Sequence, residues 1–248
     1  MTFLVLLVLA ILLVLAVSSF SRYRQEQRAR NDELRQAVTQ QGWRYEDRPL
    51  RGVETRIRGE RDGIAWTLEQ HNPAAADDLT TPTWLWLADA SPCGEIELML
   101  LDPPSADAMR GVLGEAVIRI AEKSLGQIGG SGTNLRQFFE RARESIFLDS
   151  TLQTRFKVLT LDAGFARHLL DPAAEQALLE WPDARITVQA SRHNIILRLT
   201  CAELDTDNLR RLVDLGALLT RNVRRYDAQR RCLDAAGAPL AKPPRSPV

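Results

Sequence analysis

Histidine is the side chain that most often carries acid–base chemistry or holds a metal, and this chain has three, His71, His168 and His193. The pattern places them at a strand end, in a short helix and in a hairpin turn. No HExxH or comparable ligand spacing links any two of them. The sequence therefore predicts no metal ligand and no cofactor, and it predicts that each histidine is a solvated polar residue.

Glycines gather between residues 126 and 134 (GQIGGSGTN), where a phosphate-binding loop could form. A P-loop requires Lys followed by Ser or Thr after its last Gly, and here Thr133 follows Gly132 directly. The run also misses GxSxG by one position, because Thr133 stands where the final Gly belongs. The sequence favours an interhelical linker over residues 126–133.

Carboxylates and thiols are the remaining candidates for chemistry. Glu95 and Glu97 alternate on an expected strand and could present paired carboxylates, while Asp77-Asp78 lie in an expected loop. Neither pair has a companion His or third acid, so both are predicted to lie on solvent faces. Cys93 stands in a Pro-Cys-Gly turn with no nearby cation to activate it. We predict no catalytic, cofactor-binding or metal-binding residue, which favours a protein that is not an enzyme.

The N-terminal segment predicts how the chain is held in place. Residues 2–20 (TFLVLLVLAILLVLAVSSF) contain no charged residue, no Pro and no Gly. A helix of this length is about 28 Å long, close to the roughly 30 Å of a membrane's hydrocarbon core. Basic residues follow this segment, which predicts that everything after Phe20 is cytoplasmic. The first of them are expected to contact lipid headgroups: Arg22, Arg24, Arg28 and Arg30.

A cleaved signal peptide is the alternative, because Ala16-Val17-Ser18 is a small-x-small triplet of the kind that precedes cleavage. Composition favours the retained anchor, since three widely spaced cysteines fit a reducing compartment better than a disulfide framework. The 32 basic residues balance 32 acidic ones, which argues against a nucleic-acid partner. We therefore expect a single-pass protein of a bacterial inner membrane, with its oligomeric state left open.

Beyond the anchor, the pattern predicts an α+β fold in which an antiparallel sheet of hairpins packs with amphipathic helices. Residues 21–42 are rich in helix formers and predict a helical stalk that ends at Gly42, with too few apolar residues for an interface. Two α+β lobes follow, residues 43–125 and 134–233, joined by the Gly-rich linker. The Pro-rich residues 234–248 predict a disordered tail.

Alternating apolar residues predict three hairpins. The first joins residues 53–58 to 64–68 through Asp62-Gly63, a pair that favours a type I′ turn. The second joins residues 83–88 to 95–101, and the third joins residues 186–190 to 195–201. Within the second, Trp84 and Trp86 share one face and Leu85 and Leu87 the other. Two apolar faces predict a covered, central strand, and an aromatic binding platform is the alternative.

Helices are expected between and after these strands. Ser105 is expected to cap a helix that runs to residue 121, and a second helical stretch covers residues 135–146. Two short helices, around residues 165–170 and 173–181, follow a strand at residues 155–161. A long helix closes the fold, and its buried stripe is predicted to be Leu209, Leu212, Val213, Gly216, Leu219 and Val223.

The anchor, the stalk and the segment at residues 156–170 (FKVLTLDAGFARHLL) together resemble uncharacterised single-pass membrane proteins of bacteria. The resemblance implies no activity and no site. We therefore expect a membrane-anchored protein whose cytoplasmic domain binds a protein or a membrane component. One alternative is a membrane-tethered hydrolase whose site combines distant residues, such as Ser131 with a histidine and a carboxylate. The other is an exported periplasmic protein.

Overall fold

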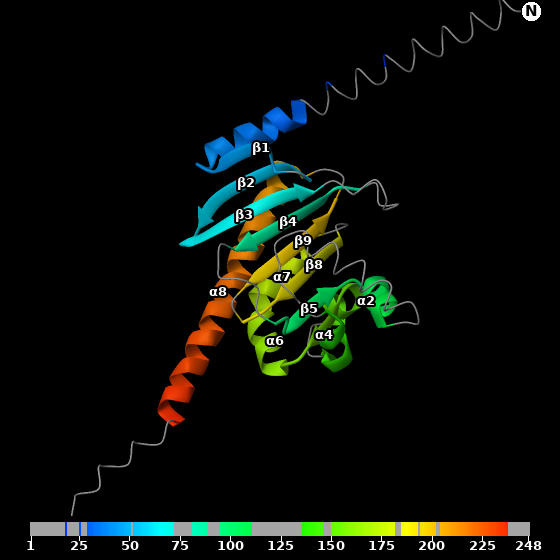
Figure 1. Ribbon diagram of the computed structural model, residues 1–248, viewed down its shortest axis with the longest axis vertical. Coiled ribbons are helices and arrows are strands. Elements are labelled where there is room, and N and C mark those ends of the chain that lie inside the picture. The colour runs from blue at the N-terminus through cyan, green and yellow to red at the C-terminus, as the bar shows by residue number, and fades with distance from the viewer. Residues whose placement is uncertain are drawn as a thin grey trace, which may run out of the picture.

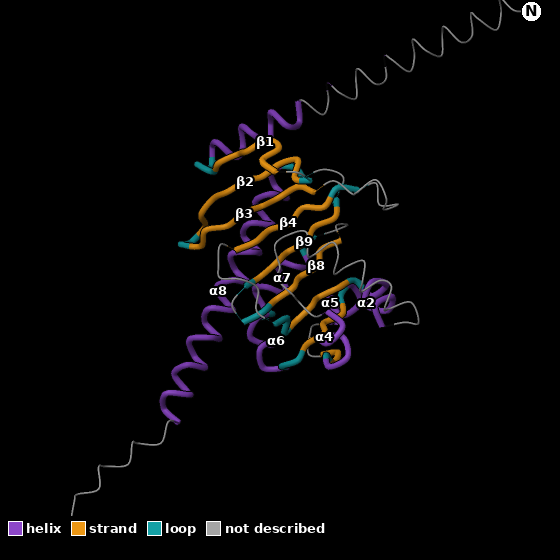
Figure 2. The backbone as a smooth tube through the Cα atoms, in the orientation of Figure 1, coloured by secondary structure: helices purple, strands orange, loops and turns teal. Residues whose placement is uncertain are grey.

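The fold is α+β, and its centre is a single antiparallel sheet. A computed structural model describes residues 18, 25, 29–50, 52–71, 81–88, 95–110, 135–145, 150–181, 185–192, 194–201 and 204–237. The sheet has nine strands in the order β1-β2-β3-β4-β9-β8-β5-β7-β6, and every neighbouring pair is antiparallel (Figures 1 and 2).

The strands are β1 (Arg44–Leu50), β2 (Val53–Arg61), β3 (Ile64–His71), β4 (Thr83–Ala88), β5 (Leu98–Leu101), β6 (Arg143–Ser145), β7 (Lys157–Thr160), β8 (Arg185–Ala190) and β9 (Ile195–Thr200). The helices are α2 (Pro103–Arg110), α4 (Leu135–Arg141), α5 (Ser150–Arg155), α6 (Ala163–Leu169), α7 (Pro172–Leu179) and α8 (Thr206–Gly237). Residues 29–40, which precede β1, are also helical.

Helices cover both faces of the sheet, as the alternation along β5 shows. Leu98 and Leu100 join the main core, which also holds the buried side chains of α6, α7 and α8. Met99 and Leu101 point to the opposite face and join a smaller core with residues of α2 and α4. Because successive side chains of a strand point to opposite faces, β5 lies between two helical layers.

The first and third predicted hairpins are confirmed. Arg61 of β2 stands opposite Ile64 of β3, and the two turn residues, Asp62 and Gly63, have φ values of 53° and 71°. Positive φ at both positions is what a type I′ turn requires. In the third hairpin, Ala190 of β8 stands opposite Ile195 of β9.

The second predicted hairpin is wrong. β4 pairs with β3 and β9, whereas β5 pairs with β8 and β7. The hairpin of β8 and β9 therefore lies between the two strands that we expected to pair. Apolar residues on both faces identify β4 and β5 as covered strands, but they carry no information about which strand lies beside each.

The sheet joins strands from both predicted lobes. β5, from residues 43–125, lies between β8 and β7, which belong to residues 134–233. The lobes thus share one sheet and one main core rather than forming two separate sheets. The Gly-rich linker at residues 126–133 lies outside the described residues.

The helix at residues 29–40 packs against the sheet, unlike the stalk predicted for this part of the chain. Leu34, Ala37 and Val38 are buried, and Leu34 and Val38 belong to the main core. The helix ends at Gly42 as expected, with a φ of +72° that suits Gly. Three apolar residues spaced i, i+3 and i+4 lie on one side of a helix and are enough to pack its last turns against a sheet.

Helix α2 begins earlier than predicted, and its cap is Asp102 rather than Ser105. The Asp102 carboxylate accepts hydrogen bonds from the backbone N–H of Ser105 (2.7 Å) and from the Ser105 hydroxyl (2.9 Å). Pro103 and Pro104 have no N–H to satisfy, so a helix can begin at them. Residues 111–134 lie outside the described part of the chain.

The predicted stripe of α8 is confirmed, because Leu209, Leu212, Val213, Leu219 and Val223 are all buried. Gly216 completes the stripe where α8 crosses the indole of Trp86 on β4. α8 continues to Gly237, beyond the start of the predicted tail, and residues 238–248 lie outside the described residues.

Trp84 and Trp86 are 3% and 0% exposed and belong to the main core, as predicted for a covered, central strand. The predicted membrane segment at residues 2–20, Ser18 apart, lies outside the described residues. Within the described part of the chain, no helix is both long and apolar enough to cross a membrane.

Candidate functional site

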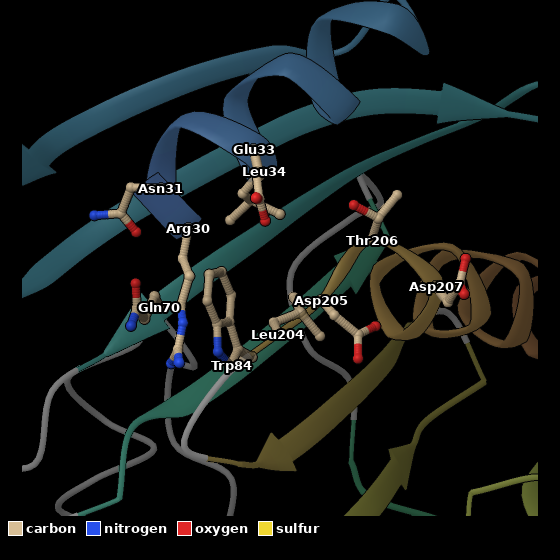
Figure 3. Close-up of a pocket in the computed structure, with 10 residues that line it drawn as sticks. All are labelled: Arg30, Asn31, Glu33, Leu34, Gln70, Trp84, Leu204, Asp205, Thr206 and Asp207. Atoms are coloured by element: carbon tan, nitrogen blue, oxygen red, sulfur yellow. The ribbon is translucent and has the colours of Figure 1, made fainter. Parts of the chain in front are cut away.

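A pocket of about 420 Å³ lies where the helix at residues 29–40 meets the N-terminal end of α8 (Figure 3). The ends of β3 and β4 form its other walls. The residues that line it are Arg30, Asn31, Glu33, Leu34, Gln70, Trp84, Leu204, Asp205, Thr206 and Asp207. A volume of this size is typical of sites that hold a small ligand or a side chain of a partner.

The floor of the pocket is apolar. Leu34 and Leu204 are each 7% exposed, and Trp84 is 3% exposed. The indole of Trp84 stands between the helix at residues 29–40 and the segment that leads into α8 (Figure 3). Its Nε1 is buried without a hydrogen-bond partner among the described residues. Trp84 therefore offers the pocket an aromatic surface rather than a hydrogen-bond donor.

The rim of the pocket is acidic. It carries the carboxylates of Glu33, Asp205 and Asp207 against the single guanidinium of Arg30, so these four groups sum to −2. Asp205 caps α8, since its Oδ1 accepts a hydrogen bond from the N–H of Asn208 (2.7 Å). Glu33 and Asp207 are exposed, and a bound cation at Asp207 would compete with Arg210, which lies 4.0 Å away. The arrangement suits a ligand with an apolar group beside a positive charge.

A second hollow, of about 310 Å³, lies between β2, α7 and α8. Its opposite charges are already paired within the protein, Arg61 with Asp214 at 2.9 Å and Arg221 with Asp62 at 2.9 Å. A ligand there would have to compete with those pairs, so the pocket over Trp84 is the better candidate.

The prediction that Glu95 and Glu97 both lie on a solvent face is correct for Glu95 and wrong for Glu97. Both residues precede β5, and Glu95 is exposed whereas Glu97 is buried. The Glu97 carboxylate forms an ion pair with Arg192 from the turn between β8 and β9. Burial raises the pKa of Glu97, and the Arg192 guanidinium only partly offsets that effect. Glu97 therefore serves a structural ion pair at the end of the sheet.

Asp162 lies close to Glu97 and ties α6 to α8. Its Oδ1 accepts the backbone N–H groups of Gly164 (2.8 Å) and Phe165 (3.1 Å), and its Oδ2 accepts the hydroxyl of Tyr226 (2.9 Å). Burial opposes ionisation of Asp162, but these hydrogen bonds hold its pKa below the usual value.

We expect Asp162→Ala to lower the free energy of unfolding by about 1–2 kcal/mol, because it removes the cap of α6 together with the bond to Tyr226. Asp162→Asn is the matched control. Asn also caps helices well, so this variant should lose clearly less stability than Asp162→Ala. Urea unfolding of both variants measures the difference. Equal losses for Ala and Asn would show that the cap contributes nothing.

The three histidines differ in their surroundings. His71 lies at the end of β3, with its Nε2 3.1 Å from Glu69 Oε2, so it is not simply a solvated residue. His168 lies on α6 with its ring 5.5 Å from that of Tyr226. His193 is outside the described residues. Among the residues that the structure describes, no group of three His, Cys, Asp or Glu side chains could hold a metal ion.

Of the four arginines predicted to contact lipid headgroups, Arg30 lines the pocket. Arg22, Arg24 and Arg28 lie outside the described residues, as do Cys93, Asp77-Asp78 and Ser131.

Sequence reasoning missed the pocket itself. Its floor combines Leu34, Trp84 and Leu204, which are far apart in the chain. One signal was available, because the spacing of Leu34, Ala37 and Val38 already marks an apolar side on the predicted stalk.

Comparisons with known proteins leave the family open: no protein-family model and no curated protein matches this chain. Among solved structures, the chain is similar to the crystal structure of the mycobacterial trehalose monomycolate transport factor A. The two share 12% sequence identity with a TM-score of 0.39, over 79% of this chain and 92% of that one. Similarity at that level has no bearing on function.

Proposed function

We propose that this protein is a membrane-tethered binding protein of a bacterial inner membrane, with its folded domain in the cytoplasm. Residues 2–20 anchor it, and the pocket over Trp84 receives part of a protein or membrane component. The observation that carries the proposal is the position of the pocket, because the helix that follows the anchor forms one of its walls.

Chain length sets how far the pocket can lie from the membrane. Arg30, on the pocket rim, is ten residues after Phe20. Ten residues span at most about 36 Å when fully extended. A pocket held this close to the bilayer meets membrane components and the cytoplasmic parts of membrane proteins more often than it meets freely diffusing molecules.

The residues of the pocket favour binding over catalysis. The described lining holds acids, amides, apolar side chains, one Arg and one Thr, but no His, Cys or Lys. Its described residues offer the Thr206 hydroxyl and three carboxylates but no imidazole or thiol, so they do not form the Ser–His or Cys–His pair of covalent catalysis. An apolar floor with a charged rim is instead the common form of a binding surface, in which the floor supplies affinity and the rim selects the partner.

The topology is tested by fusing two reporters after Val248, one active only in the cytoplasm and one active only in the periplasm. We expect the cytoplasmic reporter alone to be active. In parallel, Leu9→Arg with Leu12→Arg should release the chain from carbonate-washed membranes, because two charges in a span are costly. Leu9→Ile with Leu12→Ile is the matched control. An active periplasmic reporter would overturn the proposal.

The binding role is tested with a photo-crosslinking amino acid at Asn31 on the rim, and at Gln137 of α4 as a distant exposed control. We expect a specific crosslinked product from position 31 in intact cells. Glu33→Lys with Asp207→Lys should reduce its yield about tenfold, whereas Glu60→Lys with Glu140→Lys, the same charge change elsewhere, should not. Equal yields from all of these chains would contradict binding at the pocket.

A further inference from the structure

The C-terminal part of α8, beyond the buried stripe of the helix, carries a concentration of positive charge. Arg224, Arg225, Arg230 and Arg231 are all exposed. Asp227 is the acid among residues 224–232, and it pairs with Arg231 at 3.0 Å. Four arginines and one aspartate give this segment, which we name the basic arm, a charge of +3 in a chain whose formal net charge is zero.

The basic arm extends beyond the rest of the fold. Figure 1 shows α8 continuing past the sheet and the other helices to its C-terminal end. The buried stripe of α8 ends at Val223, and residues 228–232 are exposed without interruption. Tyr226 still packs against α6, so packing accounts for the first turn of the basic arm. It does not account for residues 228–232, and a polar helix end that leaves its own domain is suited to meeting something outside it.

We propose that the basic arm binds the anionic headgroups of the same membrane leaflet that holds the anchor. This inference rests on the proposed tether, which keeps the arm close to that surface. Each basic residue near an anionic leaflet adds to the attraction, and a cluster that supplements one hydrophobic anchor is a common second membrane signal. The two contacts together would fix the orientation of the domain, which a single flexible tether does not.

The dimensions of the fold allow this contact. The start of α8 and Arg30 line the same pocket. Cys232 lies 26 residues after Thr206 on one helix, which places it about 39 Å along the axis. The tether before Arg30 is no longer than about 36 Å. A tether of up to this length allows the domain to lie with α8 along the membrane surface, so that the pocket end and the basic arm can both face the leaflet.

The charge of the basic arm favours anionic headgroups as its binding partner. A second copy of the arm would repel it, because both carry the same sign. The anionic leaflet is the polyanion that the tether holds permanently within reach, at high effective concentration.

Cys232 offers a reporter within the basic arm. It is exposed, whereas Cys201 is partly buried, and burial raises the pKa of the Cys201 thiol to about 11. In a full-length chain with Cys93→Ser and Cys201→Ser, a fluorescent maleimide therefore labels position 232 alone. Acrylamide, a neutral quencher, then measures how accessible the label is to water without responding to surface potential.

The labelled chain is reconstituted into vesicles of pure phosphatidylcholine or of phosphatidylcholine mixed with phosphatidylglycerol. We expect quenching to fall about twofold in the anionic vesicles, and to recover in ~1 M NaCl, where the Debye length is about 3 Å. Arg224→Gln, Arg225→Gln and Arg231→Gln together should abolish the fall. The matched control removes three exposed arginines elsewhere, with Arg136→Gln, Arg141→Gln and Arg143→Gln, and should keep it.

Equal quenching in the two kinds of vesicle, or a fall that survives the arm variant, would overturn the membrane contact of the basic arm. Flotation with the neutral vesicles separates this failure from failure of the tether. A chain that floats with phosphatidylcholine yet shows equal quenching is anchored but has a free arm. A chain that does not float at all contradicts the tether on which both proposals rest.

Discussion

Gly216→Val is expected to lower the free energy of unfolding by about 3 kcal/mol. Gly216 lies where α8 crosses β4, and a Cβ at this position would stand 2.5 Å from Cε2 and 2.6 Å from Cδ2 of Trp86. Trp86 is fully buried, so its indole has little room to move. Either α8 shifts away from the sheet or the indole leaves its rotamer, and both disturb the main core.

Gly216→Ala makes the test sharper, because helix propensity and packing predict opposite signs. In an exposed helix, replacing Gly by Ala stabilises by about 1 kcal/mol. At Gly216 we expect a loss of stability instead, since even one methyl group meets the Trp86 ring. Urea unfolding of the full chain in detergent, followed by tryptophan fluorescence, measures the change. Gln229→Val in the exposed part of α8 is the control and should change stability by no more than about 0.5 kcal/mol.

A gain in stability from Gly216→Ala would contradict the close approach of α8 to Trp86. If Gly216→Ala lowers stability as much as Gly216→Val does, then the Cβ atom alone causes the clash. The distances from this Cβ to the Trp86 ring imply such a result.

Glu69→Gln is expected to lower the free energy of unfolding by about 2–3 kcal/mol at neutral pH, because it removes the closest carboxylate of the buried Arg56 guanidinium and leaves only Glu46, 3.9 Å away. Arg56 and Glu69 stand opposite each other on β2 and β3, and their side chains are only 10% and 12% exposed. Arg56 Nε donates to Glu69 Oε1 at 2.8 Å, and Nη2 of the same side chain lies 2.6 Å from that oxygen.

The stability that Glu69 contributes depends on pH, and its sign follows from the direction of the pKa shift. The hydrogen bond to His71 lowers the pKa of Glu69, burial raises it, and Arg56 lowers it further, so the folded-state pKa lies below the usual value. A carboxyl group with a depressed folded pKa stabilises the fold above its unfolded pKa, near 4.3, and loses that contribution as pH falls through the folded value. The difference in unfolding free energy between the original chain and Glu69→Gln should therefore be largest above about pH 5 and should decrease as the pH falls.

Urea unfolding at a series of pH values measures this difference. Glu60→Gln is the control, because Glu60 lies on the same strand as Arg56 but is exposed, and its substitution should have little effect at any pH. A difference that stays constant as the pH falls would show that the ionised carboxylate of Glu69 does not stabilise the fold.

Much of the secondary structure was readable from the sequence because it depends on neighbours in the chain. Alternating side chains identify β2, β3, β8 and β9, and Asp62-Gly63 fixes one hairpin through its positive φ angles. The stripe of α8 follows from helical periodicity, because positions three and four apart share one face. In each case a few adjacent residues contain all the information that the prediction needs.

The sequence did not allow us to predict which distant strands pair in the sheet. β4 and β5 are covered on both faces, and nothing in such a strand says which neighbour it takes. The structure inserts the hairpin of β8 and β9 between them. The helix at residues 29–40 is a second example. Its apolar residues Leu34 and Val38 are too few to predict an interface from the sequence, but they are enough to pack the helix against the sheet.

The sequence by itself thus determined the α+β class, two hairpins, the long closing helix and the expectation of an anchor, because local periodicity and composition encode them. Only the tertiary structure decided that Glu97 is buried while Glu95 is exposed. It also brought Leu34, Trp84 and Leu204 together as the floor of one pocket. The physical reason is that burial and pockets depend on which distant surfaces meet, and many arrangements of the same elements satisfy the local pattern equally well.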